Sequence, residues 1–310
     1  MPEIKVGLIG GSGLGQVLGS QTDGHRHDVE TPFGKPSDVI VETEWAGLPV
    51  YFLSRHGPGH LLNPSQVPFR ANIFALKKLG CTHILASGAV GSLREEFKPR
   101  DLVVPDQVID KTHKRPGTFY ENAAVHVEFS EPFCPVLRQI LLEAGKSGNH
   151  PAGSVFNVHD RGCYVAMEGP AFSTRAESLM HRLWGGDLIG MTAMPEAKLS
   201  KEAEISYALI ALVTDYDCWR GVPASKSVVE GEMAKPQAAL LKEIIENLEA
   251  ASNNAISLMR RAVELMAIQK ETLSLCPAQN ALKLAIWSDK AKIDKLEVQR
   301  LAPLWMKYFE

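Results

Sequence analysis

Short apolar runs of strand length alternate with segments of helical periodicity along most of this chain. Strands are predicted at runs that are often bounded by Gly or Pro, namely residues 6–9, 39–41, 50–53, 83–86, 102–104 and 208–213. Helices are predicted at residues 67–79, 135–144 and 173–184, and within 195–212 ahead of the last strand. Alternation of this kind is typical of an α/β sandwich.

The C-terminal part of the chain is predicted to be mainly helical. Residues 228–265 have helical periodicity with charged residues for a solvent face, and residues 281–309 combine one short apolar run with a second helical period. We find no internal repeat, low-complexity tract or linker that would separate these segments from the rest. We therefore expect a single domain over residues 1–310, with a core at 1–220 and a helical C-terminal part at 221–310.

The composition is that of an ordinary globular protein, with 45% apolar and 22% charged residues. The formal net charge of −3 gives no general attraction to nucleic acid or to anionic membranes. No apolar run approaches the ~20 residues of a membrane-spanning helix, and the first residues lack a signal-peptide layout. The 5 cysteines are scattered without a CxxC pair, which indicates reduced thiols. We expect a cytoplasmic protein without a nucleic-acid or membrane partner.

Two carboxylates, Asp215 and Asp217, follow the apolar run at residues 207–213. Because side chains alternate along a strand, carboxylates two residues apart point toward the same place. Open α/β sheets bind their ligands at the carboxyl ends of the strands. A carboxylate pair at such an end can hydrogen-bond or protonate a planar, nitrogen-rich ring. Two solvated acids that merely end a strand would also fit the pattern.

A glycine-rich segment, GGSGLG at residues 10–15, follows the first predicted strand. Glycines let backbone N–H groups approach an anion closely, and Ser12 adds a hydroxyl donor. The spacing does not fit the dinucleotide-binding fingerprint, because Gln16 stands where that motif needs glycine. On its own, a glycine-rich turn after a strand is more often only a tight turn.

Two further strand ends carry groups that suit an anion. Arg55 and His56 follow the strand at 50–53, and a guanidinium can hold an oxyanion through two parallel hydrogen bonds. Residues 87–92, with the sequence SGAVGS, follow another predicted strand and are expected to form a turn with free N–H groups. Three anion-binding strand ends beside one acidic strand end predict a site for phosphate and a base together.

The motifs also occur in an order known from one family: IGGSGL, TPFGKPSD, SRHG, ANIFALKKLGCTH, GSLREE, EPFCP, MEGPAFSTRAES, GMTAMPEA and TDYDCW. With them, the chain resembles the trimeric branch of the purine nucleoside phosphorylases, and within it the 5′-methylthioadenosine phosphorylases. The likeness runs from about Lys5 to Trp219 and is thinner beyond Arg220. It implies a phosphorylase-type three-layer α/β sandwich, with a central mixed sheet flanked by helices and additional C-terminal helices.

The resemblance also implies a reaction and its site: a purine nucleoside and inorganic phosphate give a free base and ribose 1-phosphate. Phosphate is a co-substrate, and neither a metal nor an organic cofactor is implied. The phosphate would be held by Ser12, Arg55, His56, Gly88, Ala89 and Thr192. The sugar would lie on Met191, and the purine would contact Phe172, Ser173, Asp215 and Asp217. In a homotrimer or hexamer, the 5′ end of the nucleoside would meet Val228 and the neighbouring subunit's copy of His126.

The chemistry of glycosidic bond cleavage fits these residue types. Positive charge develops on the sugar, where a phosphate dianion would stabilise it, and negative charge develops on the departing base. A protonated Asp215 beside N7 can neutralise the base as a general acid, which contributes typically ~10²–10⁴-fold. Burial near Asp217 would raise the pKa of Asp215 as this role requires. Asp217 can accept a hydrogen bond from an exocyclic amine, so we expect adenine rather than hypoxanthine.

Several alternatives stay open from the sequence. The same scaffold could act on 6-oxopurine nucleosides such as inosine or methylthioinosine, could bind nucleosides without catalysis, or could use water instead of phosphate. The 5′ substituent is open as well, because Gly231 and Glu232 fall at positions that are usually apolar in methylthioadenosine enzymes. We expect Glu168 and Glu196 to be structural hydrogen-bond anchors rather than ligand contacts.

Overall fold

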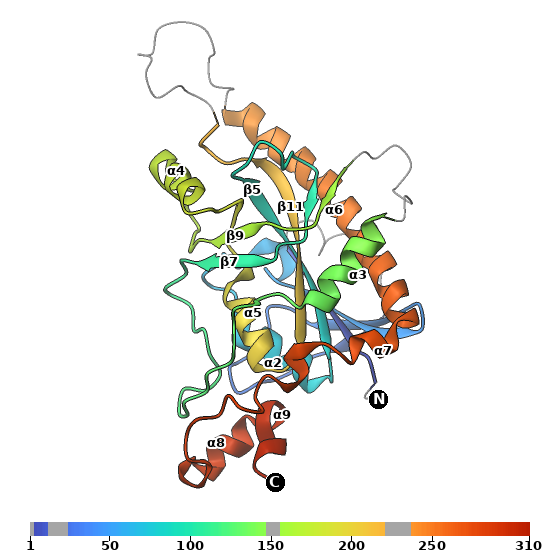
Figure 1. The fold of residues 1–310 in the computed structure, drawn as a ribbon, viewed down its shortest axis with the longest axis vertical. Coiled ribbons are helices and arrows are strands. Elements are labelled where there is room, and N and C mark those ends of the chain that lie inside the picture. Colours follow the sequence, from blue (N-terminus) through green and yellow to red (C-terminus); the bar gives the residue numbers. More distant parts are fainter. Residues whose placement is uncertain (1–2, 12–23, 147–155, 221–236) are drawn as a thin grey trace, which may run out of the picture.

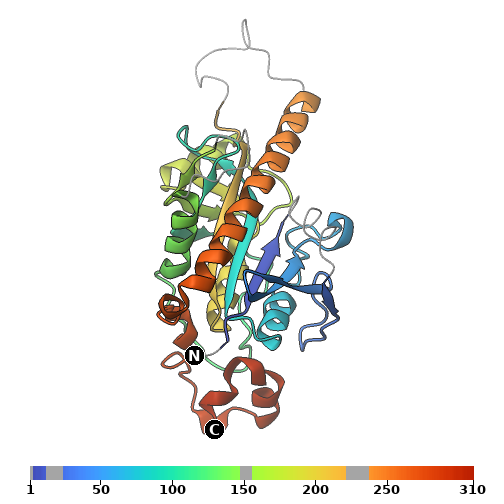
Figure 2. The same cartoon turned by 90° about the vertical axis from the view of Figure 1, so that its right-hand side faces the viewer.

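The computed structural model of this chain describes residues 3–11, 24–146, 156–220 and 237–310. Within these residues the fold is an α/β sandwich, in which one large mixed sheet lies between helices on both faces (Figure 1). The predicted three-layer arrangement with a central mixed sheet and further C-terminal helices is confirmed. Turning the molecule by 90° shows α6 lying along one face of the sheet (Figure 2).

Parallel strands form the centre of the sheet. Their order is β4, β1, β5 and β11, with bounds Leu48–Ser54, Val6–Gly10, His83–Ser92 and Ser206–Tyr216. β1 pairs with β5 only as far as Ala86, whereas β11 pairs with β5 along its length. A register shift between Val213 and Asp215 adds one residue to β11 relative to β5, as a β-bulge does. β5 and β11 therefore extend beyond β1 and β4 at the carboxyl end of the sheet.

Shorter strands complete the sheet on both sides. On one side lie β2 (His25–His27) and β3 (Ile40–Trp45), which are antiparallel to their neighbours. On the other side β10 (Leu188–Gly190) pairs with β5, followed by β9 (Cys163–Ala166) and β7 (Gln107–Asp110). β6 (Leu102–Val103) and β8 (Val158–His159) lie beside β11. The sequence analysis did not predict β2, β7, β8, β9 or β10, which are too short to give a periodic signal.

Helices cover the two faces of the sheet and bury two separate apolar cores. α3 (Pro135–Lys146) and α6 (Gln237–Ile268) pack on one face, and the core there includes Leu137 and Leu212. α2 (Phe69–Lys78) and α5 (Ala193–Glu202) pack on the opposite face. α4 (Arg175–Leu183) lies at the edge and begins with a capping box between Thr174 and Glu177.

The C-terminal residues form a small helical lobe at one end of the molecule (Figure 1). α7 (Lys270–Leu273) follows α6 and packs on the main body. The lobe contains α8 (Lys295–Arg300) and α9 (Ala302–Trp305), with short 3₁₀ turns at Pro277–Asn280, Lys290–Lys292 and Met306–Tyr308. The Trp305 side chain is fully buried in the core that contains α2. The lobe is thereby fixed to the main body through apolar packing.

Two expected elements need correction. The prediction of a turn at residues 87–92 is wrong, because β5 continues through Ser92 while it pairs with β11. The helical pattern within 195–212 belongs to α5, which ends at Glu202, and the strand begins at Ser206. None of the helices in the described ranges is both long and apolar enough to cross a lipid bilayer.

Candidate functional site

The two carboxylates at the end of β11 converge on Gly91 of the neighbouring strand. A Cβ atom added to Gly91 would lie 3.4 Å from Cβ of Asp217 and 3.6 Å from Oδ2 of Asp215. The register shift pairs Asp215 with Gly91, and a side chain at this position would press on both acids and on Ile189, whose Cγ2 atom lies 3.0 Å from the added Cβ. We call Gly91, Asp215 and Asp217 the base end of the site.

The two acids of the base end have different surroundings. Asp215 accepts a 2.6 Å hydrogen bond from the hydroxyl of Thr214 through Oδ1. Asp217 is buried, yet its Oδ2 atom has no hydrogen-bond partner among the described residues. A buried carboxylate oxygen without a partner is costly, so this atom is suited to accept a hydrogen bond from a ligand.

Burial raises the pKa of Asp215, and the negative charge of Asp217 raises it further, although the Thr214 hydroxyl opposes both effects. A carboxyl with a raised pKa holds its proton at higher pH than an ordinary aspartate does. This is the property that a general acid needs. The structure therefore gives Asp215 the electrostatic environment that the sequence analysis expected.

The segment after Asp217 is attached to β5 through one backbone oxygen. The carbonyl of Ser92 accepts hydrogen bonds from Asp217 N at 3.0 Å and from Trp219 Nε1 at 2.8 Å. The Arg182 guanidinium lies over the Trp219 ring, 3.7 Å from its centroid. These contacts fix the backbone of Asp217 relative to Gly91.

Arg55 lies at the carboxyl end of β4 and is completely buried. Its Nε and Nη2 atoms donate to the two carboxylate oxygens of Glu196 at 2.7 and 2.8 Å. Its Nη1 atom donates to the Ser87 carbonyl at 2.7 Å. Glu196 thus occupies the edge formed by Nε and Nη2, and an anion would meet Arg55 on the side of Nη1. Glu196 is a structural anchor, as expected.

The ends of β1, β4 and β10 and the middle of β5 meet around this guanidinium. A Cβ atom added to Gly11 would lie 3.2 Å from Arg55 Nη1 and 3.8 Å from Cα of Gly88. A Cβ atom added to Gly88 would lie 3.0 Å from Thr192 Oγ1. Because β1 pairs with β5 only up to Ala86, this stretch of β5 faces Gly11 and Arg55 instead of another strand. We call Gly11, Arg55, Gly88, Thr192 and Glu196 the anion end of the site.

His56 and Ala89 lie next to the anion end in the sequence. The His56 ring contacts the Leu62 carbonyl through Nδ1 at 2.8 Å, which leaves Nε2 on the other side of the ring. Burial lowers the pKa of His56 to about 4, and the neighbouring charge of Arg55 contributes. His56 is therefore neutral at physiological pH in the free protein. Ala89 lies within β5 and is exposed, in contrast to the buried Gly88.

Arg115, which the sequence analysis did not single out, holds the segment that follows β10. It donates through Nη1 to the carbonyls of Met191 and Met194, the second at 2.7 Å. It also donates through Nε to Glu168 Oε1 at 3.1 Å and through Nη2 to the Glu168 carbonyl. No motif around this residue gives a signal for these contacts, which depend on residues far away in the sequence.

Glu168 completes this cluster as a structural anchor, as expected. Its carboxylate accepts hydrogen bonds from Ser65 Oγ and from the backbone N–H groups of His113 and Lys114, the last two at 2.8 and 3.2 Å. Burial acts to raise the pKa of Glu168, but these hydrogen bonds and the charge of Arg115 lower it to about 2. Glu168 is thus fixed in its charged form, unlike Asp215.

The residues expected to contact sugar and base lie around these two ends. The side chain of Met191 packs against Gly169. A Cβ atom added to Gly169 would lie only 2.5 Å from Sδ of Met191. The Ser173 carbonyl accepts a hydrogen bond from Cys218 Sγ at 3.3 Å, which places this segment beside the base end. Phe172 is 84% exposed, so no other described residue covers its ring.

His126 is exposed and lies away from both ends, against the C-terminal lobe. Its backbone N–H donates to the Ala285 carbonyl at 2.9 Å, and its ring lies 4.6 Å from that of Trp287. Trp287 and Leu284 are exposed apolar neighbours on the same lobe. Ser12 and Val228, expected at the phosphate and at the 5′ end, lie outside the described residues.

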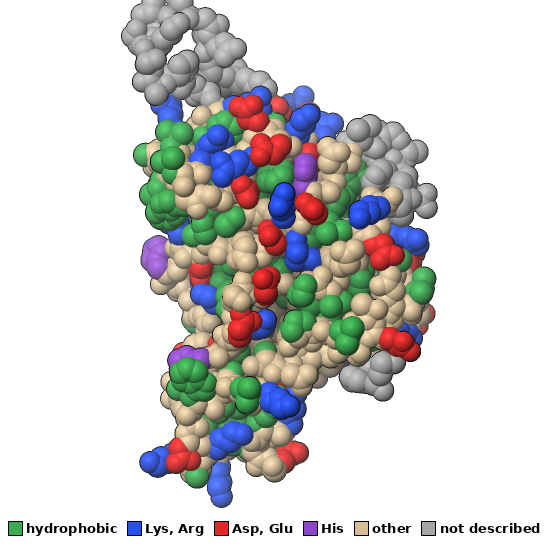
Figure 3. All heavy atoms as spheres, in the orientation of Figure 1, with side chains coloured by type: hydrophobic (Ala, Val, Ile, Leu, Met, Phe, Trp, Pro, Cys, Tyr) green, Lys and Arg blue, Asp and Glu red, His purple; other side chains and the backbone are tan. Residues whose placement is uncertain are grey.

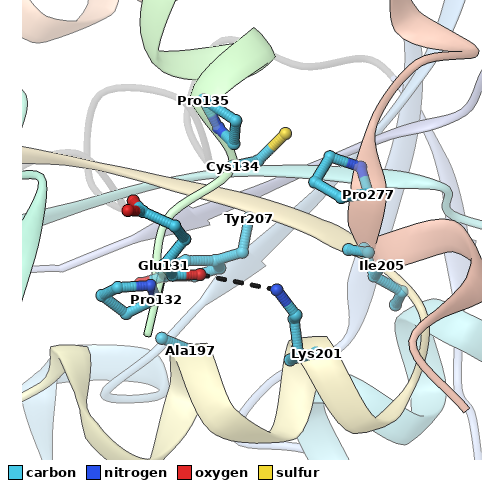
Figure 4. A pocket seen from close by; sticks show the side chains of 10 residues that line it. Glu131, Pro132, Cys134, Pro135, Ala197, Lys201, Ile205, Tyr207 and Pro277 are labelled. Carbon is cyan, nitrogen blue, oxygen red and sulfur yellow. Dashed lines mark hydrogen bonds between the residues drawn. The ribbon is translucent and has the colours of Figure 1, made fainter. Parts of the chain in front are cut away.

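Outside this site, the molecule has a hollow that is unsuited to a nucleoside. A small hollow between the start of α3 and α5 (Figure 4) has a volume of about 10 Å³, about enough for one water molecule and too little for a nucleoside. In the described part of the chain, no cluster of three or more His, Cys, Asp or Glu side chains is arranged to hold a metal ion. On the face in Figure 3, basic and acidic side chains are interspersed.

The arrangement combines a proton-holding carboxyl, an unpartnered carboxylate oxygen and a cradle of glycines around a buried guanidinium. Such a set can protonate a ring nitrogen, accept a hydrogen bond from an amine and place an anion near both. Comparison with known proteins gives a family for this geometry. A sequence model of the phosphorylase superfamily matches residues 5–264 of this chain.

Individual relatives cover nearly the whole chain. The S-methyl-5′-thioadenosine phosphorylase of Gloeobacter violaceus is 43% identical over 308 residues, covering 99% of this chain and 97% of that protein. The protein of the same name from Geobacter sulfurreducens is 45% identical over 301 residues, covering 96% and 97%. These matches include the C-terminal lobe, where the sequence motifs are sparse.

Solved structures agree with the fold. The crystal structure of a methylthioadenosine phosphorylase from an Antarctic soil metagenomic library has a TM-score of 0.84 at 42% identity, covering 98% of this chain and 99% of that one. A variant of the Schistosoma mansoni adenosine/methylthioadenosine phosphorylase in complex with methylthioadenosine has a TM-score of 0.80 at 36% identity, covering 92% and 99%. The predicted phosphorylase-type fold is confirmed by these structures.

Proposed function

This chain belongs to the phosphorylase superfamily, and we propose that it cleaves S-methyl-5′-thioadenosine with inorganic phosphate. The products are adenine and 5-methylthioribose 1-phosphate, which serve purine and methionine salvage. One observation carries the proposal: the two acids converge on Gly91, and three residues earlier on the same strand Gly88 lies in the glycine cradle at Arg55. The relatives named S-methyl-5′-thioadenosine phosphorylase support the choice of substrate.

The base end supplies the leaving-group chemistry. Asp215, protonated because burial and Asp217 raise its pKa, donates its proton to N7 as the glycosidic bond breaks. The unpartnered Oδ2 of Asp217 accepts a hydrogen bond from the exocyclic amine of adenine. The departing base leaves as a neutral molecule, which removes the cost of an anionic leaving group. Phe172 and Ser173 are proposed to line the base, and Met191 the sugar.

The anion end supplies the nucleophile. Phosphate is proposed to lie between Ser12, Arg55, His56, Gly88, Ala89 and Thr192, under the sugar. There its charge stabilises the positive charge that develops on the sugar, and one oxygen then attacks C1′. Glu196 holds the guanidinium of Arg55 in one position, so that the donor does not reorient during the reaction. The reaction assigned to these residues uses no organic cofactor and no metal.

The 5′ end and the assembly extend this proposal. His126 and Val228 are proposed to contact the 5′ substituent, with His126 acting on the site of a neighbouring subunit in a homotrimer or hexamer. The exposed position of His126 beside Trp287 supports a role outside its own subunit's site. We further propose that the chain is a single domain, with its core at 1–220 and its C-terminal part at 221–310, and that it works in the cytoplasm.

The test is base release from four nucleosides, with and without phosphate. We expect methylthioadenosine to be cleaved fastest, adenosine more slowly, and methylthioinosine and inosine slowest, because Asp217 accepts from a 6-amino group but not from a 6-oxo group. All release is expected to require phosphate. Detection of 5-methylthioribose 1-phosphate by mass spectrometry identifies the second product.

Each other outcome selects a different function. Release without phosphate would make the protein a hydrolase, and faster cleavage of inosine or methylthioinosine would make it a 6-oxopurine phosphorylase. Tight nucleoside binding by calorimetry with no release of base would make it a binding protein. The matched control is Glu264→Gln on the exposed side of α6, which removes a carboxylate far from the site.

A further inference from the structure

Two of the cysteines form a buried pair away from the site described above. The Sγ atoms of Cys134 and Cys276 are 3.4 Å apart, although the residues are 142 positions apart in the sequence. Both side chains belong to the core under α3 and α6. A disulfide has an S–S distance of about 2.05 Å, so the two sulfur atoms need to approach by only ~1.4 Å to form one.

Cys134 is placed where a thiolate is stabilised. It directly precedes α3, and its carbonyl accepts the N–H of Arg138 at 3.0 Å, which makes it the N-cap residue. The hydrogen bond from Cys276 lowers the pKa of the Cys134 thiol against the effect of burial, and the N–H groups of Leu137 and Val136 lower it further. Thiolates at helix N-termini are the reactive form of cysteine in many redox proteins.

The other thiols lack this environment. Burial raises the pKa of Cys81 and of Cys163, the second to about 11. Cys218 is exposed but also has a raised pKa, because burial of its sulfur and the charge of Asp217 act together. Cys134 therefore has a stronger thiolate character than Cys81, Cys163 and Cys218.

Cys134 is one of the residues that line the hollow in Figure 4. Cys134, Pro135 and Pro277 line one side of this hollow, and Ala197 and Lys201 of α5 line the other. Its volume of about 10 Å³ is enough for about one water molecule, so the hollow excludes all but the smallest reagents. Pro277 directly follows Cys276, so the hollow borders both cysteine segments.

We propose that Cys134 and Cys276 are a peroxide-sensitive oxidation site that closes to an intramolecular disulfide. The Cys134 thiolate attacks one oxygen of hydrogen peroxide, the O–O bond breaks, and water leaves after protonation, which yields a sulfenic acid. The Cys276 thiol then attacks this sulfur, forms the S–S bond and releases a second water. Two thiols lose two electrons and two protons in total, and peroxide is reduced to two molecules of water.

The bond would join the start of α3 to the residue that precedes the C-terminal lobe. Cys134 is held to β11 by a 2.8 Å hydrogen bond from its N–H to the Tyr207 carbonyl, whereas Cys276 leads into the segment that pairs with residues 124–126. The crosslink closes a long loop, and such loops gain the most from a disulfide in the chain-entropy account. We expect a reversible increase in thermal stability, independent of the reaction that the protein catalyses.

The experiment treats full-length protein carrying Cys218→Ser with hydrogen peroxide, so that the exposed thiol does not react. We expect a mass loss of two hydrogen atoms, a Cys134–Cys276 crosslinked peptide in non-reducing digests, and a rise of the unfolding midpoint by about 5 °C that dithiothreitol reverses. Adding Cys276→Ser should stop the reaction at the sulfenic acid, which dimedone traps on Cys134.

The controls separate this pair from general thiol oxidation. Cys163→Ser in the same background should leave the crosslink and the midpoint shift unchanged, whereas Cys134→Ser should abolish both. A dimedone adduct on Cys163 or Cys81 in place of Cys134, or a crosslink between other cysteines, would overturn the proposal. A mass that stays unchanged after peroxide treatment would also overturn it. Peptide mapping of the peroxide-treated protein without any substitution tests the same point.

Discussion

The two ends of the site both contain a buried carboxylate, but only the anion end pairs it with a positive charge. At the anion end, Arg55 and Glu196 are both buried and satisfy each other through two hydrogen bonds. At the base end, Asp215 and Asp217 carry like charges, and an oxygen of Asp217 has no partner in the described structure. One end keeps its charge fixed, and the other is able to change its protonation. A reaction that moves a proton to the base while an anion stays in place uses this difference.

The largest expected effect is a loss of turnover when the acid of the base end is replaced. Asp215→Asn removes the proton donor while it keeps the shape of the side chain, so kcat on methylthioadenosine should fall by about 10²–10⁴-fold. Steady-state base release measures it. Glu264→Gln should retain full activity, and an Asp215→Asn protein with wild-type kcat would remove Asp215 from the acid role.

Replacing a residue of the anion end should lower the free energy of unfolding. Glu196→Gln leaves the Arg55 charge buried without a counter-charge, and removal of one partner from a buried pair costs about 3–5 kcal/mol of the free energy of unfolding. Urea denaturation measures this change. Asp217→Asn is the comparison, because Asp217 has no such partner and its replacement should change stability much less. Equal losses in the two variants would contradict the contrast between the ends.

Arg115 holds the segment after β10, which contains Met191 and Thr192 of the anion end. Arg115→Lys keeps the positive charge but cannot reach the carbonyls of Met191, Met194 and Glu168 together. We expect kcat/KM to fall by roughly 10–100-fold, because misplacement by about 1 Å has effects of this size. Kinetics with each substrate varied in turn, alongside circular dichroism of the folded variant, measures it. An unchanged kcat/KM in Arg115→Lys would show that Met191 is positioned without this residue.

Base preference should depend on Asp217. In Asp217→Asn the amide can donate to a 6-oxo group, so the ratio of kcat/KM for methylthioadenosine to that for methylthioinosine should fall by about 10-fold or more. Competition between the two nucleosides in one reaction measures the ratio directly. A ratio that stays constant would place the selecting group elsewhere in the site.

The smallest effect concerns pH. The raised pKa of Asp215 keeps it protonated to higher pH, and kcat should fall as the pH rises through that pKa. Asp217→Asn removes the negative neighbour, which makes ionisation of Asp215 easier and lowers its pKa. The high-pH limb of kcat should therefore move to lower pH, by about one unit or less. A shift toward higher pH would contradict the electrostatic account of the base end.

The base end was largely predictable from the sequence, whereas the anion end was predictable only in part. Asp215 lies at the end of β11 and Asp217 directly follows the strand, so local periodicity is enough to bring them together. The Arg55–Glu196 pair joins residues 141 positions apart. Because Glu196 takes two of the Arg55 donors, the parallel hydrogen bonds that the sequence analysis expected for an anion are made to Glu196 instead. Local patterns contain no information on such a long-range partner.

The fold shows the same division. Long apolar strands such as β1, β4 and β11 were found within a few residues of their bounds, because each has a continuous buried run. The strands β9 and β10 have only 4 and 3 residues and are stabilised by pairing with each other and with β5. The segment 87–92 was mistaken for a turn because its small residues have low strand propensity, which tertiary pairing with β11 overrides.

The additional residue in β11 between Val213 and Asp215 has a consequence for insertions and deletions. Loss of a single residue at this point would restore even pairing with β5 and leave the buried strand before it untouched. Without Thr214, Asp215 would still stand opposite Gly91, but β11 would lose the local bend of the bulge, so the side chain of Asp215 would point in a different direction. At this irregularity the requirements of folding and of reactivity diverge, and a shortened chain would be stable but inactive.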